Sequence, residues 1–227
     1  MNYQIRIHFS SMKEFVMDTK KEITGLARRM AKCKTYDEAW MLGLELEAFG
    51  QVSTVAFKYV LEHGTQMARH AAAFWLSDEA EIVPAEVFLK MASDDDHEIR
   101  FHAAYGLGYV RHADVVKTLQ KLMRHDSNPE VRQTAAQSLF AAAKINNAVD
   151  AIIDDFAHTL IHDESSMVRE EAATSLANFL KTPVLHRAID LLEKSLEDTD
   201  EAVRVQARIS LAVLRNEIWE ELRAASI

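Results

Sequence analysis

Histidines and carboxylates are the side chains of this sequence that could bind a metal ion or catalyse a reaction by proton transfer. The 227 residues include 10 histidines, 35 Asp and Glu residues and a single cysteine. His70 and His102 lie in two copies of a recurring helical pattern, but neither is followed by a glutamate. An iron site built on these histidines would need carboxylate oxygen ligands beside them. We therefore expect no metal centre and no cofactor. The helix dipole accounts for the histidines near predicted helix ends, which are His63, His125 and His162.

The other local motifs for chemistry are incomplete. Asp94, Asp95 and Asp96 could begin a calcium loop, but the turn glycine and the bidentate glutamate of such loops are missing. Cys33 stands between two lysines, which favours a lowered thiol pKa, yet no histidine is close in sequence to act as its base. The sequence has no glycine-rich phosphate loop and no Cys-x-x-Cys pair. We therefore expect a protein that is not an enzyme.

The composition is typical of a helical, non-membrane protein. Only 6 glycines and 3 prolines occur, too few for the many turns of a β-sandwich or an α/β fold. The chain has no apolar run long enough for a membrane span and no signal peptide, so we expect a cytoplasmic location. Residues 1–34 carry eight Lys and Arg against three Asp and Glu, whereas residues 35–227 carry eighteen against thirty-two. An acidic body makes nucleic-acid binding an unfavourable interpretation, although a local basic patch stays possible.

One pattern recurs along the chain, and it reads as the second helix of a helical hairpin. It consists of an aliphatic residue, Arg, two variable residues, two alanines, two variable residues and Leu, as in Ile99–Leu107 and Val131–Leu139. Successive arginines are 31, 32, 37 and 35 residues apart, and the longest spacing predicts a longer helix or turn around residues 144–149. The arginines of the pattern are Arg69, Arg100, Arg132, Arg169 and Arg204.

An aspartate precedes each of the last four arginines by six residues, and an apolar stretch with helical spacing precedes each aspartate. Stacked hairpins would bring each aspartate within reach of a neighbouring arginine, so we expect a ladder of ion pairs. Partly exposed pairs contribute only about 0–1 kcal/mol each, which favours a role in register over one in stability. The aspartates are Asp94, Asp126, Asp163 and Asp198.

This motif resembles the HEAT-repeat family, in particular the short repeats of the phycobilin-lyase type. The resemblance is strong over residues 83–215 and weaker over residues 36–76. It implies an all-α fold, a right-handed α-solenoid of about six helical hairpins. We divide the chain into residues 1–34, residues 35–82 with degenerate repeats, and residues 83–227 with regular repeats and a C-terminal helix.

The N-terminal segment departs from the repeat. Residues 2–9 alternate between apolar and polar side chains, which predicts an extended, strand-like arm. Ser11 and Glu14 form a capping box ahead of a basic amphipathic helix, and Thr35 and Glu38 form a second one. We expect the amphipathic helix to cover the end of the repeat core.

The variable positions of the second helices are the candidates for function. Residues two and six after the aliphatic residue should point away from the core, toward the groove of a solenoid. Whether Phe74, Phe101 and Tyr105 are exposed there or pack between adjacent repeats is left open. We expect a protein-binding scaffold or adaptor whose partner has basic character; the oligomeric state is left open. The alternatives are a tetrapyrrole-binding or chromophore-attachment factor of the phycobilin-lyase type, using His70, His102 and Tyr105, and a HEAT-like nucleic-acid-binding or repair module. The predicted partner-binding residues are His70, Phe74, Phe101, His102, Tyr105, Gln133, Gln137 and Phe140.

Overall fold

The computed structural model describes the backbone of residues 2–225 and the side chains of residues 16–218 and of Arg223. Twelve α-helices and four short 3-10 helices make up the described chain, and residues 2–225 contain no strand. The all-helical repeat fold predicted from the sequence is confirmed. The chain divides into two compact units, Met1–Val83 (unit 1) and Pro84–Ile227 (unit 2). Within residues 2–225 we find no helix with the length and apolar character that crossing a bilayer requires.

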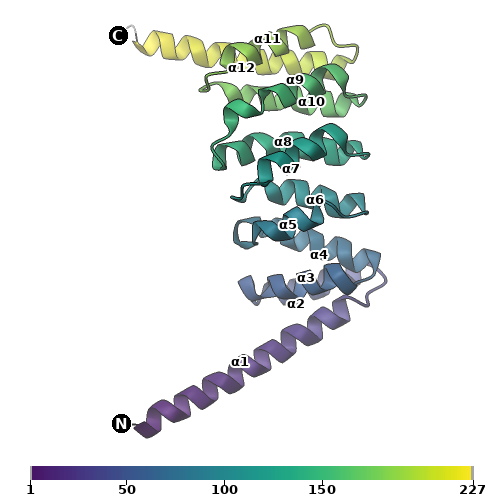
Figure 1. Ribbon diagram of the computed structural model, residues 1–227, viewed down its shortest axis with the longest axis vertical. Helices are drawn as coiled ribbons and strands as arrows, with labels where there is room; N and C mark the ends of the chain where they lie inside the picture. Colours follow the sequence, from purple (N-terminus) through teal and green to yellow (C-terminus); the bar gives the residue numbers. More distant parts are fainter. Residues whose placement is uncertain (1, 226–227) are drawn as a thin grey trace. The chain divides into compact units, whose positions relative to one another are not determined.

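Unit 1 is a group of four α-helices (Figure 1). Thr35 caps α2 as predicted, because its hydroxyl accepts the Glu38 N–H. The core contains Met30, Leu46 and Phe57. The helices are α1 (Asn2–Met30), α2 (Tyr36–Glu47), α3 (Ser53–His63) and α4 (Gln66–Asp78), with 3-10 helices η1 (Gly50–Val52) and η2 (Ala80–Ile82).

The prediction of an extended, strand-like arm over residues 2–9 is wrong. Helix α1 runs without a break through residues 2–30, so the alternating segment is helical and Ser11 lies inside the helix instead of capping it. A single strand without a neighbour leaves its backbone N–H and C=O groups unpaired, whereas a helix pairs them within the segment. The buried side chains of α1 that the structure describes, Ile23 to Met30, do cover the core of unit 1, where α1 packs on α2 and α3.

Unit 2 consists of four successive hairpins, shown in teal to yellow in Figure 1. The second helices pack on one another in order, α6 on α8, α8 on α10 and α10 on α12, and α7 packs on α9. The aliphatic residue, the first alanine and the Leu of the repeat are buried in all four hairpins. The first helices are α5 (Ala85–Met91), α7 (Val115–His125), α9 (Ile153–His162) and α11 (Leu185–Ser195); the second helices are α6 (His97–Leu107), α8 (Pro129–Ile145), α10 (Ser166–Ser175, continued by η4, Leu176–Phe179) and α12 (Glu201–Ala225).

The additional residues of the longest repeat spacing lie in α8 and in the turn that joins α8 to α9. Helix α8 has 17 residues against 11 in α6, and it is followed by Asn147 in the left-handed region (φ 56°) and by η3 (Val149–Ala151). The Asn146 side chain ties this turn to the loop ahead of α7, because its amide accepts the His112 N–H at 3.1 Å and donates to the Val110 carbonyl at 3.3 Å. The longer helix and turn predicted at residues 144–149 are therefore found at this joint.

Candidate interaction surfaces

The recurring spacing of Asp and Arg places these residues in a ladder along unit 2. Arg100 Nε and Nη2 donate to the two carboxylate oxygens of Asp126 at 2.7 and 2.8 Å. Its Nη1 donates to the Asp94 carbonyl oxygen at 2.9 Å, in its own hairpin. Each guanidinium thus joins the loop of its own hairpin to the carboxylate of the next. The same two-oxygen contact joins Arg132 to Asp163 and Arg169 to Asp198.

Each ladder aspartate also organises its own loop. Asp163 Oδ1 accepts the Ser165 N–H at 2.9 Å, and Asp126 Oδ1 accepts the Asn128 N–H at the same distance. The residue whose N–H is bound in this way immediately precedes the second helix. Asn128, for example, caps α8, because its side-chain oxygen accepts the Glu130 N–H. A single aspartate therefore shapes the loop and fixes the neighbouring hairpin.

The middle pair of the ladder is more buried than we expected from the sequence. The side chains of Arg132 and Asp163 are 8% and 7% exposed, so the pair belongs to the interior and the range for exposed pairs does not apply. At Asp126 burial favours the neutral carboxyl, but hydrogen bonds from Arg100 and from the Asn128 N–H hold its pKa below the ordinary value. The hydrogen bond from Arg169 lowers the pKa of Asp198 in the same way.

The predicted partner-binding residues in unit 1 do not form an open surface. Phe74 of α4 is half-buried and packs against Trp40 of α2, with ring centroids 4.5 Å apart. Trp75 lies edge-on to Phe74 at 5.6 Å. Phe74 is therefore part of an aromatic cluster between α2 and α4. His70, also on α4, is half-buried.

In unit 2 the predicted residues divide between packing and exposure. Phe140 packs edge-on against Phe179 at 4.9 Å and is half-buried. Tyr105 is exposed on α6, as is Gln137 on α8, and these two occupy equivalent positions of their repeats. The three remaining residues are half-buried; they are Phe101 and His102, whose rings meet edge-on at 5.2 Å, and Gln133.

The exposed face extends beyond the residues that we predicted. Tyr109, one turn after Tyr105, is exposed, and the two hydroxyls lie 3.2 Å apart. On α12, Val205, Ile209 and Val213 are exposed at intervals of four residues, and Ile209 is 51% exposed. The spacing of four residues between these aliphatic side chains is visible in the sequence and could have revealed the row. We define the second-helix face as Tyr105, Tyr109, Gln137, Thr174, Val205, Ile209 and Val213, all exposed.

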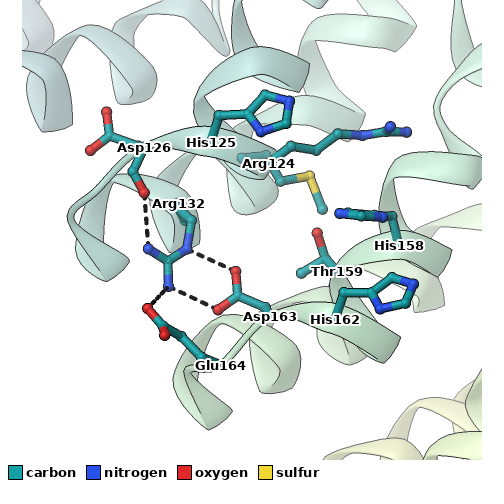
Figure 2. Close-up of a pocket in the computed structure, with 10 residues that line it drawn as sticks. Arg124, His125, Asp126, Arg132, His158, Thr159, His162, Asp163 and Glu164 are labelled. Atoms are coloured by element: carbon teal, nitrogen blue, oxygen red, sulfur yellow. Dashed lines mark hydrogen bonds and ion pairs between the residues drawn. The ribbon is translucent and has the colours of Figure 1, made fainter.

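A polar cleft of about 230 Å³ lies on the first helices, between α7 and α9. Figure 2 shows the His158 and His162 rings at one end of this cleft and the Arg132–Asp163 pair at the other. Burial, followed by the charges of Arg124 and the neighbouring histidines, lowers the pKa of His158. We call this site the histidine cleft; its histidines are His125, His158 and His162.

Sequence reasoning missed the histidine cleft because it treated each histidine alone. The spacing of His158 and His162, four residues apart in a predicted helix, was the available signal. A second expectation needs correction at Cys33. Its thiol pKa is raised, by burial first and then by the Glu38 carboxylate, and the charge of Arg29 does not offset these effects. The thiol lies 3.5 Å from the Arg29 carbonyl oxygen, to which it donates.

The comparisons with known proteins agree with this architecture. Residues 85–154 match the family model for HEAT repeats. No curated protein matches the chain in sequence. Two crystal structures of engineered proteins share the fold: one is 19% identical, with a TM-score of 0.52 over 86% of this chain and 97% of its own, and the other is 20% identical, with a TM-score of 0.53 over 86% and 98%. A designed armadillo repeat protein is 17% identical, with a TM-score of 0.52 over 85% of this chain and 91% of its own.

At these identities the solved structures are evidence of the fold alone. The ladder, the buried repeat positions and the family match concern the same hairpins, since α5 to α8 lie within residues 85–154. The resemblance that the repeated Asp and Arg motif indicated is therefore confirmed: residues 85–154 match HEAT repeats, and the chain has an all-helical repeat fold.

Proposed function

We propose that the chain is a non-enzymatic protein-binding scaffold and that the second-helix face of unit 2 contacts the partner. The observation that carries this proposal is the distribution of exposed apolar side chains. Unit 2 has six large exposed apolar residues among those that the structure describes, and five of them lie on α6, just after it, or on α12. The sixth, Ile161, lies on the first helix α9.

The chemistry of this face favours a partner with apolar anchors. Because the second helices pack on one another in order, the equivalent exposed positions form a row, with tyrosines at one end and aliphatic residues at the other. Exposed aromatic and aliphatic clusters of this kind anchor protein interfaces. Gln137 and Thr174 in the middle of the row can hydrogen-bond to a backbone or to a polar side chain.

The charges beside this row favour a partner with basic character. At the outward positions of the four repeats in unit 2 the sequence places no Lys or Arg, and Glu170 is the charged residue among them. The same absence of cations counts against a nucleic-acid interface on this face. The tetrapyrrole alternative used His70 together with His102 and Tyr105; the first lies in unit 1 and the other two in unit 2, and no observation favours a site made from them.

Affinity capture with the full chain and two matched variants tests the proposal. The face variant carries Tyr105→Ser and Ile209→Ser, and the control carries Ile161→Ser, a comparable loss of exposed apolar surface on a first helix. We expect the control to retain the proteins that the wild-type chain captures and the face variant to lose them. Retention by the face variant together with loss by the control would show that the partner binds elsewhere.

A further inference from the structure

Three histidines from two successive first helices line one cleft, and their rings are free to bind a ligand. His125 ends α7, and His158 and His162 lie in the last two turns of α9, which packs on α7. All three side chains are exposed. Within the part of the chain that the structure describes, none of their ring nitrogens takes part in a hydrogen bond or an ion pair. The cleft therefore offers three unpaired imidazoles from two hairpins.

The spacing on α9 is suited to chelation. Residues four apart lie on one face of a helix, and two histidines at this spacing can hold one zinc ion, as they do in helical metalloprotease sites. The rings of His158 and His162 are 4.8 Å apart between centroids and tilted by 46°. His125 approaches the same cleft from the neighbouring helix.

We propose that His158 and His162, with His125 as a third ligand, bind a divalent transition metal ion. Imidazole nitrogen suits zinc, copper and nickel, whereas magnesium and calcium require oxygen ligands. Zinc is the ion that we propose, because three histidines leave its fourth tetrahedral position for water.

The ring nitrogens of the three histidines do not all lie within 4.8 Å of one another, so binding requires the rings to turn. Exposed side chains change rotamer within nanoseconds, and no hydrogen bond to the described residues holds these rings in place.

The charges around the cleft permit a cation. Arg124 lines the cleft, and its Nε contacts the buried Asp155 carboxylate at 2.6 Å, which offsets part of its positive charge. The other oxygen of Asp155 accepts the Gln120 amide at 2.7 Å. Arg132 is likewise paired with Asp163, so each arginine that lines the cleft has a carboxylate partner.

A metal ion here would join two successive hairpins of the stack. His125 belongs to the hairpin α7–α8, and His158 and His162 belong to α9–α10, and between these hairpins the repeat spacing is longest. A ligand that binds only the folded arrangement stabilises it by mass action. Zinc would therefore reduce the separation of α7 from α9.

A second group of possible ligands provides an internal control. His97, Glu98 and Glu130 have ligand atoms within 4.8 Å of one another. They lie in the first turns of α6 and α8, where the positive end of the helix dipole disfavours a cation and accounts for the glutamates. This second group should not be the zinc site.

Calorimetric titration of the metal-free full chain with zinc chloride tests the proposal. We expect one ion per chain, with the affinity reduced by at least about tenfold in His162→Gln and in His158→Gln and unchanged in His97→Gln. Circular dichroism confirms that each variant is folded, and hydrogen exchange of the wild type should slow in α7 and α9 when zinc is added. Failure to bind zinc, or binding that His97→Gln abolishes and His162→Gln preserves, overturns the proposal.

Discussion

Replacing Asp163 by Ala should cost far more stability than its place in a hairpin loop suggests. The Asp163 carboxylate accepts two hydrogen bonds from Arg132, at 2.8 and 2.9 Å, and one from the Ser165 N–H at 2.9 Å. The substitution leaves the Arg132 guanidinium, 8% exposed, with the 89% exposed Glu164 carboxylate at 3.8 Å in place of a buried counter-ion. Removing one partner of a buried ion pair costs about 3–5 kcal/mol, and two hydrogen bonds to a charged group are consistent with that range.

The assay is urea unfolding of the full chain, followed by circular dichroism at 222 nm, with hydrogen exchange to locate the change. The loss should appear as faster exchange in α8 and α9, because Asp163 joins their hairpins. Asp154→Ala is the matched control: its partner Arg187 is 50% exposed and Asp154 is 66% exposed, so the loss should stay below about 1 kcal/mol. Asp163→Asn keeps an acceptor for Ser165 and should fall between the two. Equal losses for Asp163→Ala and Asp154→Ala would refute the reasoning from burial.

Three further outcomes are expected. Gly106→Ala should cost about 1–3 kcal/mol by urea unfolding, because the new Cβ would overlap the buried Phe88 ring, whereas Gly25→Ala meets no atom within 4 Å and should not destabilise the protein. The folded-state pKa of Asp126 is lowered, so the stability that its charge contributes is present above the usual Asp pKa of about 4 and is lost in acid. Asp126→Asn should therefore flatten the decline of the unfolding free energy below that pH. An unchanged slope would contradict this role of Asp126. Cys33, with its raised thiol pKa, should react with iodoacetamide more slowly at pH 8 than a free cysteine, and faster reaction would be contrary to the burial argument.

The hairpins and the ladder could be predicted because they rest on local, repeated signals. Asp126, Asp163 and Asp198 each perform three tasks that depend on fixed spacing: each accepts the N–H two residues later, its carbonyl accepts the arginine six residues later, and its carboxylate accepts the arginine of the preceding hairpin. A pattern repeated in phase therefore determines both the loop and the neighbour. The depth of burial of Arg132 was not predictable in this way, because it depends on how closely two hairpins approach.

The failures occurred where a pattern was short or a neighbour was unknown. Eight alternating residues before Ser11 were compatible with a strand, but no second strand exists for them to pair with among residues 2–225. Phe74 and Phe140 occupy outward positions, yet the rings of Trp40 and Phe179 pack against them. Some aromatic residues at outward positions are thus packed and others are exposed, and the sequence alone does not distinguish the two.

The most direct test of the account is site-specific photo-crosslinking on the second-helix face. Gln137, exposed in the middle of this face, is replaced by the photoreactive amino acid p-benzoylphenylalanine in the full chain, and Lys121, exposed on the first helix α7, is replaced in a control. The account predicts that the captured partner crosslinks to position 137 and not to position 121. Crosslinking at position 121 with none at position 137 would contradict it, because the partner would then contact the first helices.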